Sequence, residues 1–515
     1  MLPTEFVAGH RLPLALFRLL TCFLLALHLY VRTLPPTTTP IPADTSAEAA
    51  WWGLWPATYP PSWSVIVATL LLLCLTLGWW LLEQFPALLP TRYTQGPFER
   101  VIRGDPLDVP QKLAPLLSGS LLLLIAFFAF PIVHTRWGDA YLISKALAWP
   151  DPALRLTNSW QAPLDVWLHS QLWLHWHDYF QWEDALPVYR LLSPLAGGLY
   201  LAAAVAVTRV LAPAPAWLTF GLLASLGVIQ LFFGYVENYS FVAAAILIYL
   251  WLGLATLQRR APLWLAATAL ALANALHPST VILAPTLLYC GWVVVGPKST
   301  AQLRWWQATS AIFVPMLLIG GATVGMMEAG GHGLRALFTS DRPGGGDAHL
   351  FVPLWQITTR WEHYTMFSWL HLRDFLNEQL LVAPIILPGL LLGLLTIIAT
   401  RGSPLGAPPA TSDSPPANSQ QPTANSHSLH FLTLATAAYL LFTWVWNPDY
   451  GGQRDWDLFS LAAIPTALLF ALWIPRLFLH DRRALQAALI PLLVLQCLHT
   501  AAWIYQNTLP WAWPK

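Results

Sequence analysis

Long apolar stretches recur from one end of this chain to the other, and they limit its fold more than any other feature. A helix that crosses a membrane needs about 20 mainly apolar residues. Only 10% of the residues are charged, whereas a soluble domain carries about 25%. The sequence therefore predicts an all-α, polytopic transmembrane helical bundle with about 13 spans. The expected spans are residues 12–31, 64–85, 114–133, 187–208, 215–233, 239–257, 261–276, 279–296, 305–327, 380–400, 429–446, 458–475 and 484–505.

The aromatic and cysteine residues fit the same class of protein. The chain has 29 Trp, a residue that favours the boundary between membrane and water. We expect the four cysteines to be buried small side chains rather than disulfides or metal ligands, because all of them lie in apolar stretches. They are Cys22, Cys74, Cys290 and Cys497. The net charge of +1 gives no indication of a nucleic-acid partner.

The distribution of Lys and Arg predicts an orientation, because short cytoplasmic loops of membrane proteins are enriched in these residues. With the N-terminus inside, the cytoplasmic segments and the inner parts of the spans next to them hold 15 of the 26 basic residues and 7 of the 25 acidic residues. We therefore expect a multi-pass protein of the plasma (inner) membrane with a cytoplasmic N-terminus. The first apolar stretch is expected to remain as a helix rather than to be cleaved as a signal peptide.

Three long loops connect these spans. Two of them, 134–186 and 328–379, are expected outside, and the second contains a glycine-rich segment, 341–347, that could act as a lid. This segment lacks the Lys-Ser/Thr pair of a Walker loop. The inner loop 402–428 is rich in Pro, Ser, Thr and Asn and is predicted to be a disordered linker.

The first polar motif, residues 137–141 (Trp-Gly-Asp-Ala-Tyr), follows an expected span. The carboxyl group of Asp139 at the mouth of a helix bundle could be a general base or a metal ligand. A solvated loop acid or the N-cap of the next helix is the alternative. In the same loop, Asp165 is a second candidate acid, with a capping or salt-bridge role as its alternative. The stretch that follows Leu168, up to Trp182, is predicted to be a Trp-rich amphipathic helix on the membrane surface.

The second motif, residues 234–240 (Gly-Tyr-Val-Glu-Asn-Tyr-Ser), forms a short outer turn between two apolar helices. An ionisable residue at such a position suggests a functional site, so Glu237 is a candidate. Tyr235 of the same motif is a candidate for substrate binding. A solvated loop glutamate is the alternative.

The third motif, residues 449–457 (Asp-Tyr-Gly-Gly-Gln-Arg-Asp-Trp-Asp), is another short outer loop. Arg454 offers a planar set of donors suited to phosphate, and Asp455 and Asp457 are further candidates for substrate contact. An ion pair of Arg454 with one of these aspartates, which would only fix the loop, is the alternative. His277 lies at the outer end of two helices and could bind phosphate or could pack through a hydrogen bond.

With these motifs in outer loops, the chain resembles the GT-C superfamily of membrane glycosyltransferases. Those enzymes carry an acid in the first outer loop of a seven-helix module, surface helices in the same loop, and a large outer loop after the module. By this resemblance, residues 1–113 hold two additional helices and a cytoplasmic loop, 114–327 form the module, 328–379 form the large loop, and 380–515 hold the variable helices. Residues 161–164 (Gln-Ala-Pro-Leu) are similar to a Pro-rich stretch of several members.

The resemblance implies that a sugar is transferred from a polyprenyl-phosphate donor to a hydroxyl of a lipid, glycan or protein. Asp139 would take the acceptor proton, and Glu237 would orient the acceptor or hold a cation. Lys145, His277 and Arg454 would offset the charge of the lipid phosphate. Mg²⁺ or Mn²⁺ stays open as a cofactor, because the first motif lacks the Asp-Glu or Asp-x-Asp pair of the family.

The main alternative is a transporter or flippase of lipid-linked sugars. Such proteins carry charged residues at mid-membrane and inverted repeats, whereas the polar motifs of this chain cluster at helix ends. A ligase for lipid-linked glycans would share much of the layout. A non-catalytic scaffold would have no need for three acidic motifs on one face.

Overall fold

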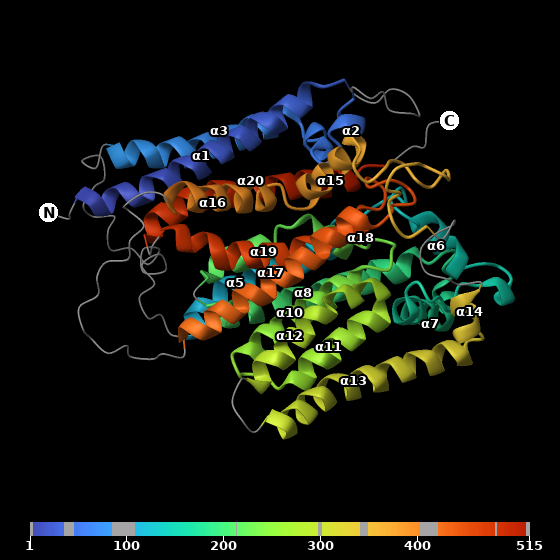
Figure 1. The fold of residues 1–515 in the computed structure, drawn as a ribbon. Helices are drawn as coiled ribbons and strands as arrows, with labels where there is room; N and C mark the ends of the chain where they lie inside the picture. The colour runs from blue at the N-terminus through green and yellow to red at the C-terminus, as the bar shows by residue number, and fades with distance from the viewer. Residues whose placement is uncertain are drawn as a thin grey trace.

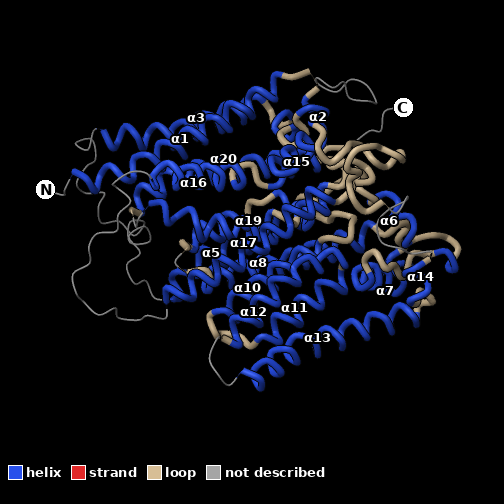
Figure 2. The backbone as a smooth tube through the Cα atoms, viewed as in Figure 1, coloured by secondary structure: helices blue, strands red, loops and turns tan. Residues whose placement is uncertain are grey.

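The computed structural model describes residues 4–35, 46–84, 109–212, 214–296, 301–339, 349–401, 421–478 and 481–510. In these segments the chain forms 19 α-helices and a few short 3-10 helices, with no β-strand. The long helices lie side by side, and α2, α6, α7 and α14 gather at one end of the bundle, where most of the connecting loops also lie (Figures 1 and 2). The predicted all-α class is confirmed.

The helices fall into two groups by length. The longer ones are α1 (Thr4–Thr33), α3 (Ser62–Gln84), α5 (Val109–Ala129), α7 (Pro163–Phe180), α8 (Leu186–Val210), α10 (Ser240–Leu257), α11 (Leu263–Leu276), α12 (Ala284–Val295), α13 (Ala301–Ala329), α15 (Trp369–Val382), α16 (Ile386–Arg401), α17 (Gln421–Val445), α19 (Ala463–Trp473) and α20 (Arg482–Asn507). The shorter ones are α2 (Ala47–Ala50), α6 (Ala140–Leu147), α9 (Ala216–Leu223), α14 (Leu334–Phe338) and α18 (Trp456–Ser460).

Fewer helices qualify as candidate membrane spans in the described residues than the sequence predicts. In the described residues, eight helical segments are long and apolar enough to cross a membrane, or up to nine if a bent pair counts as one span. The expected spans 64–85, 114–133 and 261–276 correspond to shorter apolar helices (Ser62–Gly78, Leu113–Ala129 and Leu263–Leu276). The protein is therefore a multi-pass membrane protein, with eight or nine candidate spans among the described residues, compared with 13 expected from the sequence.

The expected span 215–233 is not one helix. It is broken at Ser225 into α9 and a 3-10 helix, Gly227–Phe232. Side chains of α20 bind the buried backbone and side chain of Ser225: Thr500 donates to its carbonyl at 2.6 Å, and Gln496 donates to its hydroxyl at 2.9 Å. An interrupted helix is tolerated inside a bundle when its neighbours satisfy the freed polar groups, and hydropathy does not reveal such neighbours.

The expected span 380–400 is also interrupted. α15 starts within the predicted outer loop and ends at Val382, and its axis meets that of α16 at 103°. Pro384 follows the C-cap residue Ala383, and a proline disfavours the helical conformation of the residue before it. The pair is a broken span or a re-entrant turn.

Two predicted loop features fall largely outside the described residues. The candidate lid 341–347 lies there, as do residues 402–420 of the predicted linker. The rest of the linker, 421–428, was predicted to be disordered but belongs to α17, which begins at Gln421. Apolar content marks only the second part of this helix, which explains why the sequence places its start at residue 429.

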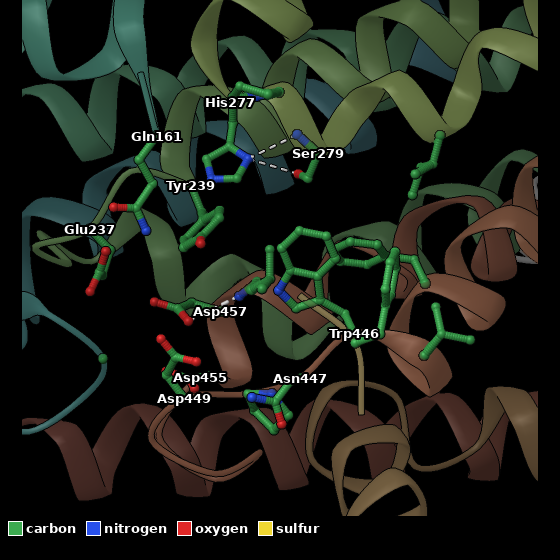
Figure 3. A pocket seen from close by; sticks show the side chains of 18 of the residues that line it. Gln161, Glu237, Tyr239, His277, Ser279, Trp446, Asn447, Asp449, Asp455 and Asp457 are labelled. Atoms are coloured by element: carbon green, nitrogen blue, oxygen red, sulfur yellow. Dashed lines mark hydrogen bonds between the residues drawn. The ribbon is translucent and has the colours of Figure 1, made fainter. Parts of the chain in front are cut away.

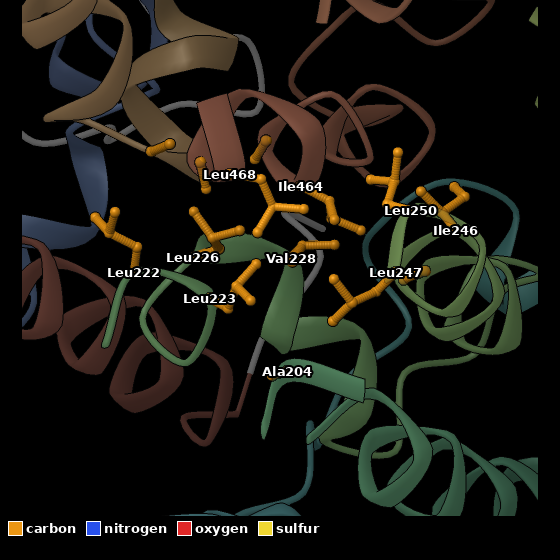
Figure 4. Close-up of a cluster of buried hydrophobic side chains, with 14 of the residues drawn as sticks. Ala204, Leu222, Leu223, Leu226, Val228, Ile246, Leu247, Leu250, Ile464 and Leu468 are labelled. Carbon is orange, nitrogen blue, oxygen red and sulfur yellow. The ribbon is translucent and has the colours of Figure 1, made fainter. Parts of the chain in front are cut away.

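The core is formed where the middle helices cross. α8 packs against α10 and α9, and α19 packs against α9 and α17. Figure 4 shows a cluster of aliphatic side chains from these elements and from the segment that follows α9. All the labelled ones are fully buried: Ala204, Leu222, Leu223, Leu226, Val228, Ile246, Leu247, Leu250, Ile464 and Leu468. The second polar motif leads into α10, and the third extends from the segment after α17 into α18, next to α19, so this packing holds the elements that carry two of the polar motifs.

Candidate active site

The three polar motifs meet at one cavity of about 550 Å³. Its wall includes residues from the loop before α6, the loop before α10, the corner between α11 and α12, and the segment between α17 and α18 (Figure 3). Its polar residues are Asp139, Gln161, Glu237, Tyr239, His277, Ser279, Asn447, Asp449, Tyr450, Asp455 and Asp457. Segments up to several hundred residues apart in sequence thus form a single polar site at one end of the bundle.

Gly138 lies at the centre of this arrangement. Its φ of +48° belongs to the left-handed region, which favours glycine. A Cβ atom at this position would lie 2.5 Å from Oε1 of Glu237 and 3.2 Å from Oδ2 of Asp457. Its N–H donates to the carbonyl of Arg454 at 2.9 Å. The backbone of the first motif therefore touches both of the other motifs directly, and no other residue type fits there.

Glu237 is buried between the first and second motifs. Its carboxylate accepts a short hydrogen bond from the N–H of Asp139 and a second, at 3.4 Å, from the N–H of Asn238. Burial raises the pKa of Glu237 well above its ordinary value, and the carboxyl groups of Asp457 and Asp139 raise it further. Glu237 therefore keeps its proton to a higher pH than an exposed glutamate does.

Asp457 is held by the second motif and by its own helix. The hydroxyl of Tyr235 donates to its Oδ2 at 2.9 Å, and the N–H of Leu458 donates to its Oδ1 at 2.9 Å. Both Asp457 and Tyr235 are buried. Tyr235 is not part of the cavity wall, and in this arrangement it positions Asp457. The substrate contact expected from the sequence stays a prediction.

Asp139 is one of the half-buried carboxylates of the site, together with Asp449 and Asp455. It occupies the N-cap position of α6, but its side chain makes no capping hydrogen bond. Instead the hydroxyl of Tyr450 donates to its Oδ1 at 2.7 Å. Tyr450 is fixed in turn, because its N–H donates to Asp455 at 2.8 Å. The third motif therefore orients the candidate acid of the first motif.

The opposite part of the cavity wall is apolar. It is formed by the start of α12, the end of α17 and the loop residue Phe351, whose backbone pairs with that of Trp446. In Figure 3 the indole of Trp446 lies across the cavity from the carboxyl groups of Glu237 and Asp457. A ligand that fills this cavity must have a polar part and a large apolar part.

Two of the predicted site residues lie away from the cavity. Asp165 is fully buried on α7, where its carboxylate lies 3.2 Å from Nδ1 of His169. Lys145 pairs with Asp184 at 3.6 Å near the surface. Neither lines the cavity, so the expected catalytic role of Asp165 and the expected phosphate contact of Lys145 have no support in this arrangement. The α7 helix itself is present, with one face buried and with Trp176 and Tyr179 exposed near its end.

His277 and Arg454 differ in their position relative to the cavity. His277 lines the cavity, but burial lowers its pKa to about 4. It is therefore neutral near pH 7 and can form a hydrogen bond without supplying positive charge. Its Nδ1 atom faces the hydroxyl of Ser279 at 2.8 Å. The guanidinium of Arg454 lies 5.2 Å from the centre of the Tyr450 ring and outside the residues that line the cavity.

The carboxylate of Asp374 on α15 supports the third motif, although the sequence does not mark it as a site residue. Asp374 accepts hydrogen bonds from the N–H of Gly452 at 3.0 Å, the hydroxyl of Tyr364 at 2.8 Å and the indole of Trp52 at 2.8 Å. It joins the loop after α2, the large outer loop and the third motif. In the sequence, Asp374 is simply an acidic residue near the end of a long expected loop, and such residues are too common to indicate a site.

In the described residues, no group of three or more His, Cys, Asp or Glu side chains is arranged to hold a metal ion. No protein-family model, curated protein or solved structure matches this chain.

Proposed function

We propose that this protein is a membrane glycosyltransferase that transfers a sugar from a polyprenyl-phosphate donor to an acceptor hydroxyl at the outer membrane face. The observation that carries the proposal is the meeting of Asp139, Glu237 and Asp457 at the polar side of a cavity whose other side is apolar. A lipid-linked sugar has this same division into a polar head and an apolar chain.

In the proposed reaction, Asp139 accepts the proton of the acceptor hydroxyl as that oxygen attacks the anomeric carbon. The bond between the anomeric carbon and the phosphate oxygen breaks, and the bonding electrons leave with the polyprenyl phosphate. Asp139 suits the role of base because it is partly accessible in the cavity and because Tyr450 fixes its Oδ1 atom. General base catalysis contributes about 10²- to 10⁴-fold to rate.

The neighbouring groups support this chemistry. Because its pKa is raised, Glu237 retains a proton to higher pH and adds less negative charge beside the donor phosphate. Gln161, Asn447 and the neutral His277 offer hydrogen bonds to sugar hydroxyls. The indole of Trp446 provides a flat apolar surface for a sugar ring or for the first part of the lipid.

The test is transfer from radiolabelled polyprenyl-phosphate sugars by the purified full-length protein in liposomes. Asp139→Asn is expected to lower the transfer rate by about 10²- to 10⁴-fold. Asp178→Asn is the matched control, because Asp178 is 93% exposed at the end of α7 and lies outside the cavity wall. Transfer that survives in Asp139→Asn would refute the assignment of the base.

The same liposomes test the alternative function. If no donor supports transfer but the lipid-linked sugar moves between leaflets, the protein is a flippase. A flippase that uses this cavity should be impaired by Trp446→Ala but not by Asp139→Asn, whereas a transferase should be impaired by both changes. The pair of variants therefore separates the two functions.

A further inference from the structure

A second cavity, of about 410 Å³, lies between α1, α3 and α20. None of its lining residues is shared with the acidic cavity. Most of its wall is formed by Leu, Val, Ala and Pro side chains. Its volume falls within the range of about 300–1,000 Å³ that is typical of small-molecule sites.

One cation is fixed in the wall of this second cavity. The guanidinium of Arg32, in the last turn of α1, donates to the carbonyls of Ala57 and Thr58 at 3.0 and 3.3 Å and to the hydroxyl of Ser62 at 3.4 Å. These bonds use at most three of the five N–H donors of an arginine. Arg32 forms no ion pair with any acid in the described part of the chain. Its charge is therefore held in place and is not neutralised by those acids.

The surroundings of Arg32 place it at the level of lipid headgroups. Trp63 is 70% exposed and Tyr505 is 40% exposed, and both residues line the cavity beside Arg32. Trp and Tyr favour the membrane interface. The apolar part of the cavity, formed by residues such as Leu25, extends from this level along the helices. The apolar walls fit a hydrocarbon chain, and the arginine fits a phosphate at the end of that chain.

We infer that this second cavity is a binding site for an anionic phospholipid, with the phosphate at Arg32 and one acyl chain between α1, α3 and α20. The N-terminal helix pair, α1 and α3, lies at the edge of the bundle (Figure 1). Such a lipid would fill the space between this pair and α20. The site is independent of the proposed transferase activity, because it uses none of the residues of the acidic cavity.

The experiment is native mass spectrometry of the full-length protein in detergent. Phosphatidylglycerol and phosphatidylcholine with the same acyl chains are added separately. We expect phosphatidylglycerol to be retained more tightly. Arg32→Gln should remove about a fivefold preference, because a basic residue near an anionic lipid contributes on the order of 1 kcal/mol.

Two further variants separate the headgroup from the chain. Ala68→Phe places a large side chain in the cavity wall and should reduce retention of both lipids. Arg335→Gln is the matched control for charge, because Arg335 is exposed on α14 and lies outside this cavity. An equal preference in the unchanged protein and in Arg32→Gln would overturn the inference. Displacement of phosphatidylglycerol by an equimolar amount of polyprenyl phosphate would assign the site to that lipid instead.

Discussion

At the scale of single residues, Gly138 decides whether the three motifs can meet. Its position between Glu237 and Asp457 leaves no room for a side chain. We expect Gly138→Ala to lower the transfer rate at least about 100-fold, because a new methyl group must displace a carboxylate and because a misplaced group costs about that much in rate. The measurement is sugar transfer by protein that has been shown to be folded.

Gly331 provides the control for this change. Its φ is +76°, so alanine is strained there as well, but nothing lies within 4 Å of the added Cβ. Gly331→Ala should therefore lower stability by about 1 kcal/mol and leave transfer unchanged. Equal losses of transfer in the two variants would show that backbone strain, rather than contact with Glu237, is responsible.

Glu237 predicts a dependence of stability on pH. Its pKa in the folded protein is raised by burial and then by Asp457 and Asp139. Above the ordinary pKa of a glutamate, the folded state therefore binds more protons at this site than the unfolded state. The stability that Glu237 contributes is full below that ordinary pKa and is lost as the pH rises through the raised one.

Thermal unfolding of the unchanged protein and of Glu237→Gln between pH 5 and pH 9 measures this effect. The amide of glutamine cannot ionise, so the unchanged protein should lose stability relative to Glu237→Gln as the pH rises. Asp178→Asn, at an exposed acid, should follow the unchanged protein at every pH. A stability difference that stays constant between pH 5 and pH 9 would contradict the raised pKa.

At the scale of elements, the short helix α2 holds the loop that carries Asp139. Glu48 of α2 forms a buried ion pair with Arg136, whose guanidinium lies 4.7 Å from the centres of the Trp55 and Trp137 rings. Removing one partner of a buried ion pair costs about 3–5 kcal/mol. We expect Glu48→Gln to lower the unfolding temperature and to reduce transfer, because Arg136 is three residues before Asp139.

Asp184→Asn is the comparison for Glu48→Gln. Asp184 pairs with Lys145 at 3.6 Å where both side chains are partly exposed, and pairs of this kind contribute about 0–1 kcal/mol. Asparagine can still accept the hydrogen bond from the N–H of Leu186. Similar losses of stability in the two variants would mean that the Glu48–Arg136 pair is no more important than a surface pair.

At the scale of the whole molecule, the cavity and the exposed aromatic residues lie at one end of the bundle. Trp355 of the large loop is 80% exposed, and Phe367 and Trp369 are each 68% exposed. The excess of Lys and Arg in the opposite loops predicts that this end faces outward. A cysteine at position 355 should then react with a membrane-impermeant thiol reagent in intact cells.

Arg260→Cys tests the opposite end, because Arg260 is exposed at the turn after α10. It should react only after the membrane is made permeable. Both variants are placed on a background in which Cys22, Cys74, Cys290 and Cys497 are changed to Ala. The reverse pattern of labelling would place the cavity inside, where a polyprenyl donor that is presented at the outer face could not reach it.

The sequence by itself determined that this is an all-helical membrane protein and which loops carry acids. Both follow from local information, because an apolar stretch of sufficient length must be helical in a bilayer and a charged residue must lie near its end. Asp139, Glu237 and Asp457 were found in this way, and the structure brings all three to one cavity.

Only the tertiary structure decided which polar residues reach that cavity and where the helices break. Asp165 and Asp139 are both loop acids in the sequence, yet packing against α8 buries one beside His169 and leaves the other at the cavity. The break at Ser225 depends on hydrogen bonds from Thr500 on α20. Contacts between residues this far apart in the chain produce no periodic pattern in the sequence. The sequence around Ser225 is compatible with an unbroken helix, and the sequence around Asp165 is compatible with a solvated loop.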